Sequence, residues 1–82
     1  MAHDSDSKVV EIFCDELGVD IKMANDAMAY NSLKGWDSLT HLTIVSRLEE
    51  AFDLELDVDD IVDMSTLGKI KEIIARNLAV KG

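Results

Sequence analysis

One short segment of the sequence combines residue types that can do chemistry, Gly35-Trp36-Asp37-Ser38-Leu39. A turn residue precedes an aspartate of the kind that caps helices, and a serine hydroxyl follows on the first helical turn. The first backbone N–H groups of a helix lack helical partners, and the helix dipole adds partial positive charge there. A phosphate esterified to Ser38 would therefore be favourably placed.

Helices are expected on both sides of this segment. The clearest is predicted over 38–52, with Asp37 as its N-cap and apolar residues along one face, namely Leu39, Leu42, Val45, Leu48 and Phe52. A first helix is predicted over about 6–17, ending at Gly18. A short third helix, capped by Asp57, carries Val58, Ile61 and Val62. The last helix, capped by Ser65, carries Leu67, Ile70, Ile73, Ile74 and Leu78.

The expected fold class is all-α, a small four-helix bundle of three long helices and one short third helix. Residues 18–37 show no clean period and form a long connection, and no alternating strand pattern of useful length is present. The chain length of 82 residues fits one domain. We expect a flexible tail at 1–7, a single domain at 8–80 and a short tail at 81–82.

Composition excludes several classes of function. A net charge of −9 argues against nucleic acid and against anionic membranes as partners. One cysteine and two distant histidines make neither a disulfide nor a zinc site. The N-terminus has no apolar signal core, and no run approaches the length of a membrane span. A cytoplasmic monomer is the expectation.

Acidic charge is concentrated in residues 49–63, which hold eight of the seventeen carboxylates and no base. Such a run is typical of a solvated face or of a surface for basic protein partners. It does not match a calcium-binding loop, because Val58 stands where the glycine of an EF-hand belongs and Met64 stands where its closing carboxylate belongs.

Three neighbouring residues invite other interpretations. Asp37, Ser38 and His41 superficially supply the acid, nucleophile and base of a hydrolase. Three side chains on one exposed turn do not easily reach that geometry, and the chain has no nucleophile elbow. His41 is better interpreted as a surface histidine. Trp36 either packs the loop against the bundle or shields whatever is attached at Ser38, and Cys14 is expected to pack as a small apolar residue.

Asp37-Ser38-Leu39 at a helix start, followed by Leu48-Glu49-Glu50-Ala51-Phe52-Asp53, resembles the acyl carrier protein family over nearly the whole chain. The resemblance implies a 4′-phosphopantetheine arm on Ser38, with Asp37 and Leu39 completing the motif. It also implies a non-enzymatic, stand-alone carrier of acyl or aminoacyl thioesters. The partners implied are a phosphopantetheinyl transferase, an acyl- or aminoacyl-loading ligase or transacylase, and downstream synthases with basic docking patches.

The chain departs from generic fatty-acid carriers, which tend to bear carboxylates soon after the serine. Thr40 and Thr43 occupy those positions here, and Arg47 lies on the same face. The resemblance therefore favours a specialised pathway, assembling a polyketide, a nonribosomal peptide or a modified lipid or sugar. The docking residues that it implies are Thr40, Thr43, Arg47, Glu49, Glu50, Asp53, Asp59 and Asp60. The competing hypothesis is an unmodified acidic helical domain that binds basic proteins.

Overall fold

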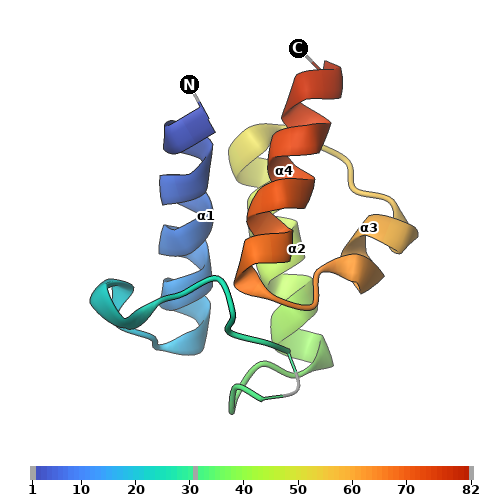
Figure 1. The fold of residues 1–82 in the computed structure, drawn as a ribbon. Coiled ribbons are helices and arrows are strands. Elements are labelled where there is room, and N and C mark those ends of the chain that lie inside the picture. The colour runs from blue at the N-terminus through green and yellow to red at the C-terminus, as the bar shows by residue number, and fades with distance from the viewer. Residues whose placement is uncertain (1, 31, 82) are drawn as a thin grey trace.

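The structure is a computed structural model, which describes the backbone of residues 2–30 and 32–81 and the side chains of 5–30 and 32–81. Across these residues it contains four α-helices and one short 3-10 helix. They are α1 (Ala2–Leu17), η1 (Ile21–Met23), α2 (Ser38–Phe52), α3 (Val58–Asp63) and α4 (Leu67–Lys81). Figure 1 shows α1, α2 and α4 as a bundle, with the short α3 to one side. The predicted all-α architecture is confirmed.

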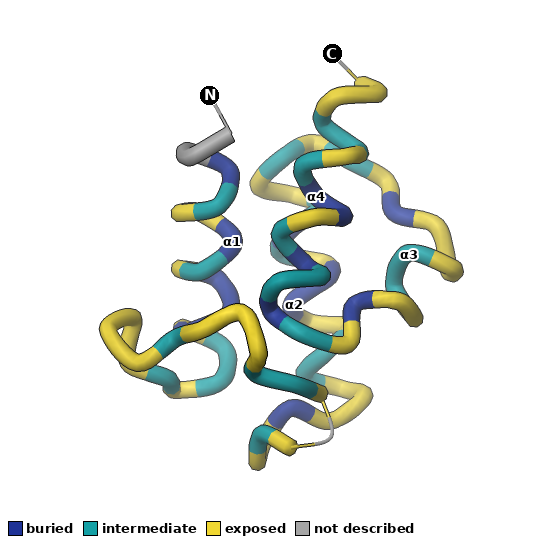
Figure 2. The backbone as a smooth tube through the Cα atoms, viewed as in Figure 1, coloured by how far each residue is buried: buried dark blue, intermediate teal, exposed yellow. Residues whose placement is uncertain are grey.

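The core lies between α1, α2 and α4, where the apolar stripes of the three helices meet. Figure 2 shows buried positions recurring on the inward faces of these helices. The most completely buried side chains on these three helices are Val9, Ile12, Phe13, Ile44, Leu48, Leu67, Ile70, Ile73 and Ile74. Each contributes about 1.5–3 kcal/mol relative to an exposed side chain. Cys14 is buried among them, as expected, and burial followed by the charge of Asp20 raises the pKa of its thiol.

The observed bounds of α1 and α2 can be compared with those predicted from the sequence. The expected bounds of α2 and the expected end of α1 are confirmed, but α1 begins at Ala2, four residues earlier than expected. Several cap-type residues follow one another at the start of the chain, and an acidic residue is as favourable in a first turn as at a cap. The division into tails and a domain at 8–80 stays a prediction, although the helix includes residues 2–7.

One expected helix cap is wrong, and another is confirmed in its position but not in its hydrogen bond. Thr66, not Ser65, caps α4, because its Oγ1 accepts a hydrogen bond from the backbone N of Lys69 at 3.1 Å. Ser65 instead accepts a 2.8 Å hydrogen bond from Tyr30 N through its backbone carbonyl. Asp57 occupies the N-cap position of α3, but its side chain makes no capping hydrogen bond.

The long connection between α1 and α2 is fastened to the start of α4. Leu67 N donates to the carbonyl of Met28 at 3.0 Å, and Gly68 N donates to the carbonyl of Asp26 at 3.1 Å. These bonds satisfy N–H groups that the first turn of a helix leaves unpaired. The Asp26 carboxylate also pairs with Lys71 at 2.7 Å. The connection is therefore held in place before it reaches Ser38.

Replacing Gly68 with alanine should lower stability although alanine is the better helix former by about 1 kcal/mol. An added Cβ would lie 3.0 Å from the Asp26 Cβ and 3.3 Å from the Asp26 carbonyl oxygen. We expect a lower midpoint of chemical denaturation for Gly68→Ala and no decrease for Glu72→Ala, an exposed control on the same helix. A Gly68→Ala protein as stable as the wild type would contradict this account of the connection.

Candidate functional site

Ser38 is the first residue of α2, and its side chain is exposed. Asp37 caps the helix as predicted, since its Oδ1 accepts a hydrogen bond from Thr40 N at 2.9 Å. Hydrogen bonds from the backbone and then the side chain of Thr40 lower the pKa of the Asp37 carboxyl. Gly35 adopts φ +92°, a left-handed conformation that favours glycine, and brings the chain into this cap.

Trp36 anchors the turn that precedes Ser38. Its side chain is only 3% exposed, and its ring lies edge-on to Phe13 of α1, with centroids 5.1 Å apart. Tyr30, from the long connection, meets the same indole at 5.8 Å. The prediction that Trp36 packs the loop against the bundle is confirmed. Ser38 therefore carries an exposed hydroxyl directly after a turn that the buried Trp36 side chain anchors.

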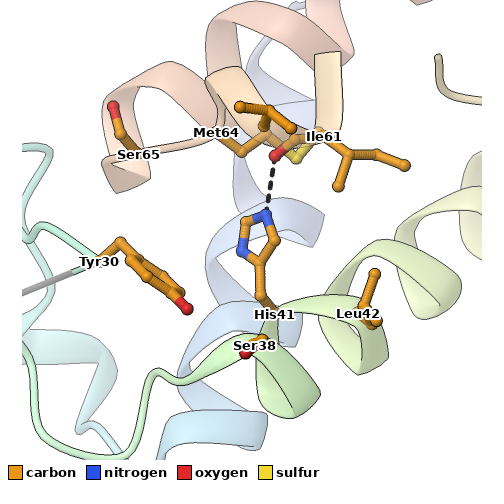
Figure 3. A pocket seen from close by; sticks show the side chains of 8 residues that line it. Tyr30, Ser38, His41, Leu42, Ile61, Met64 and Ser65 are labelled. Atoms are coloured by element: carbon orange, nitrogen blue, oxygen red, sulfur yellow. Dashed lines mark hydrogen bonds between the residues drawn. The ribbon is translucent and has the colours of Figure 1, made fainter. Parts of the chain in front are cut away.

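His41 is not the surface residue that the sequence suggested. Its Nδ1 accepts a hydrogen bond from Trp36 Nε1–H at 2.9 Å, and its Nε2 lies 2.8 Å from the carbonyl oxygen of Ile61 (Figure 3). Both imidazole nitrogens are occupied, so neither is available to the Ser38 hydroxyl. The arrangement does not provide the serine–histidine contact that a hydrolase triad requires.

An apolar pocket opens beside Ser38, between α2, α3, the segment that follows α3, and Tyr30 of the long connection. Its volume is about 320 Å³, and it is lined by Tyr30, Ser38, His41, Leu42, Ile61, Val62, Met64 and Ser65. Figure 3 shows His41 and Ser38 on one side of this space, with Ile61 and Met64 opposite. Four exposed apolar residues on α2 and α3 add to the apolar character of this end, namely Leu39, Leu42, Val58 and Val62.

Sequence reasoning did not find this pocket. Tyr30 lies in the long connection without a clean period, and Met64 fits either an adaptable apolar pocket or ordinary apolar filling. The available signal was α3 itself, because a helix of six residues that carries three large apolar side chains cannot bury them all. In the structure no residue of α3 is buried. Ile61 and Val62 instead contribute to the wall of the pocket.

The predicted docking residues near Ser38 are engaged in local contacts. Thr43 Oγ1 donates to the backbone carbonyl of Leu39 at 3.0 Å. Arg47 Nη1 lies 2.7 Å from a carboxylate oxygen of Asp15 and 2.7 Å from one of Glu16, both on α1. These hydrogen bonds raise the pKa of Arg47 and join α2 to the end of α1. The face of α2 that carries Thr40, Thr43 and Arg47 is therefore less basic than its sequence suggests.

The predicted acidic docking residues divide into two groups. Three serve the fold. Glu49 Oε2 accepts a hydrogen bond from Leu56 N at 2.8 Å. Asp53, in the left-handed conformation at the end of α2, pairs with Lys81 at 3.2 Å. Asp60 accepts hydrogen bonds from Arg76 and Asn77 of α4. The side chains of Glu50 and Asp59 are exposed and make no hydrogen bond or ion pair with the rest of the described chain.

Comparison with known proteins decides the family. A family described as "Phosphopantetheine attachment site" matches residues 7–74. The chain belongs to this acyl carrier family. An acyl carrier protein of Syntrophobacter fumaroxidans is 35% identical over 72 residues, which cover 88% of this chain and 89% of that protein. The carrier's match to the family extends over all of α2, α3 and the turn before Ser38.

Polyketide synthases contain segments similar to this carrier. "Bikaverin polyketide synthase bik1" of Gibberella fujikuroi is 36% identical over 70 residues, or 85% of the carrier. "Non-reducing polyketide synthase terA" of Aspergillus terreus is 36% identical over 66 residues, or 79% of the carrier. The carrier spans about 3% of the length of each synthase.

Phosphopantetheine is the cofactor of this family, and the site fits it. A helix N-terminus favours a phosphate, and the Ser38 hydroxyl is exposed there. A Cβ built at Gly35 meets no atom within 4 Å, so space is open beside the turn. The apolar pocket adjoins the same serine. Among helices in the described part of this carrier, none is long and apolar enough to cross a membrane.

The Asp37 cap should give α2 a pH-dependent contribution to stability. Because the folded-state pKa of this carboxyl is lowered, the contribution is present above about pH 4 and is lost as pH falls through the lowered pKa. Asparagine also caps helices but does not ionise. The free energy of unfolding of wild type minus Asp37→Asn should be positive near neutral pH and vanish toward about pH 2. A difference that does not change with pH would contradict this role.

Proposed function

We propose that Ser38 bears the phosphopantetheine arm and that the protein carries acyl groups between the enzymes of a polyketide or related specialised pathway. The observation that supports the site is the exposed hydroxyl of Ser38 at the N-terminus of α2, beside an apolar pocket. When bound, the arm supplies a thiol that holds acyl groups as thioesters. The chain itself positions and shelters the cargo and does not catalyse a reaction.

In the attachment step, the Ser38 hydroxyl loses its proton and its oxygen forms the new phosphodiester. The donor is coenzyme A, whose pyrophosphate bond breaks and whose 3′,5′-adenosine diphosphate leaves. A phosphopantetheinyl transferase, with magnesium, is the partner for this step. We place the carrier in the cytoplasm because the coenzyme A and the transferase must be available together.

The pocket supports a role in holding cargo. Its lining is almost entirely apolar, and its volume of about 320 Å³ suits the apolar part of an acyl group. Polyketide assembly is supported by the similarity to the polyketide synthases named above. It is also supported by the neutral Thr40 and Thr43, with the charge of Arg47 balanced by α1. Enzymes that load and extend acyl groups are the remaining partners in this proposal.

Ser38→Ala should abolish attachment of the arm while leaving the bundle folded. Asp37 still caps the helix, so the free energy of unfolding should change by less than about 1 kcal/mol. The measurement is intact mass after incubation with coenzyme A, magnesium and a broad-specificity transferase. The wild type should gain about 340 Da. Ser46→Ala, an exposed serine on the same helix, is the control and should gain the same mass.

Two outcomes would contradict the proposal. No gain by the wild type would favour the unmodified interaction domain, and a full gain by Ser38→Ala would place the arm on another serine.

Docking by charge should depend on the exposed carboxylates and not on those that serve the fold. We expect Glu50→Lys/Asp59→Lys to slow arm transfer several-fold at low salt, because exposed interface charges act mainly on the association rate. The melting temperature should be unchanged. Glu11→Lys/Glu72→Lys, which reverses two exposed carboxylates on α1 and α4, is the control for net charge. Equal slowing by the control would mean that docking does not use this surface.

A further inference from the structure

His41 joins the Trp36 turn to α3 through two hydrogen bonds whose directions are fixed. An indole nitrogen can only donate, and a carbonyl oxygen can only accept. Trp36 Nε1–H is 2.9 Å from His41 Nδ1, and the Ile61 carbonyl oxygen is 2.8 Å from His41 Nε2. The imidazole must therefore accept at Nδ1 and donate at Nε2. Only the neutral tautomer with its proton on Nε2 satisfies both partners.

Apart from its bond to His41, the short α3 is held by the partly buried Ile61, which packs against the core, and by polar bonds to α4. None of its six residues is buried, and Val58 and Val62 are largely exposed. The Ile61 carbonyl lies near the helix end, where carbonyl groups lack full helical partners, and its bond from Met64 N is long, at 3.3 Å. The other side-chain tethers of α3 in the described structure run to α4, from Asp60 to Arg76 and Asn77 and from Asp63 to Lys69.

We infer that His41 is a proton-sensitive positioning residue of the pocket beside Ser38. In its neutral form it couples the Trp36 turn to α3 and so fixes the wall that Ile61 and Val62 provide. A second proton, on Nδ1, turns this acceptor into a donor. Two N–H groups then face each other, and the hydrogen bond from Trp36 Nε1 to His41 Nδ1 is lost. The ring then moves away from Trp36, and the α3 wall shifts with it. The inference rests on the proposed function for the identity of what the pocket receives.

Three carboxylates on the elements around the His41 ring are bonded to partners other than His41. Tyr30 meets it through an aromatic edge, with centroids 5.7 Å apart. The Asp37 carboxylate is bound to Thr40 N, while Asp60 and Asp63 of α3 are bound to α4. Within the described residues, no carboxylate is hydrogen-bonded to His41. Histidine is the side chain whose charge ordinarily changes between about pH 5 and 8, so this is the pH range to examine.

The first test is the tautomer, measured on the protein before any arm is attached. Long-range ¹H–¹⁵N spectra distinguish the two neutral forms and the charged form of a histidine ring. A His3→Gln background leaves His41 as the remaining histidine. We expect the Nε2–H form at about pH 8. The Nδ1–H form, or a charged ring at that pH, would overturn the inference.

The second test follows coupling between about pH 8 and 5. In the wild type, the Trp36 indole N–H and the α3 amides should change with the same midpoint as the His41 ring. The protection factor of the indole proton, which is its intrinsic exchange rate at each pH divided by the observed rate, should fall about three- to tenfold on protonation, the effect of losing one hydrogen bond. An α3 response that is absent, or that has a different midpoint, would overturn the inference.

Two variants distinguish the effect of protonating His41 from the effect of its ring on packing. His41→Gln retains an acceptor and a donor that do not titrate, and it should remove the pH response while keeping slow indole exchange. His41→Phe retains a ring without either hydrogen bond, so the protection factor of the indole proton should be low at every pH. The same pH response of α3 in His41→Gln would overturn the inference. Because these measurements need no arm, they are independent of whether Ser38 is the attachment site.

Discussion

The burial of Trp36 is the interaction on which the arrangement around Ser38 depends. The indole packs against Phe13 of α1 and donates its N–H to His41 of α2, so one side chain ties the turn to two helices. The other end of the long connection is fastened to the start of α4. In the proposed function, the Ser38 hydroxyl is thereby presented to an enzyme on a backbone with little freedom to move, which lowers the entropic cost of binding.

The carboxylates of residues 49–63 have two different roles. The run at 49–63 looks uniform in sequence, but Glu49 satisfies a backbone N–H, and Asp53 and Asp60 connect α2 and α3 to α4. Glu50 and Asp59 remain on the surface. Removing the Glu49 carboxylate leaves the N–H of buried Leu56 unpaired, whereas changing Glu50 or Asp59 mainly alters the field met by a partner.

Sequence alone could predict the features that depend on neighbouring residues. The bounds of α2, the Asp37 cap and the family motif at Ser38 are local signals, and the structure or the family match agrees with each. Ser65 and Thr66 have equivalent hydroxyls, so sequence could not choose between them as the cap of α4. His41 bonds to a residue twenty positions away, the pocket brings together residues as distant as Tyr30 and Ser65, and no local pattern indicates such contacts.

The central claim is that Ser38 carries the arm on a fixed turn beside the pocket. The most direct measurement compares amide ¹H–¹⁵N spectra of the protein before and after transfer of the arm from coenzyme A. The account predicts the largest changes at residues 36–41 and smaller ones at the pocket residues Tyr30, Ile61 and Met64, with the amides of α1 unaffected. Unchanged spectra, or changes centred on another serine such as Ser65 or Ser7, would contradict it.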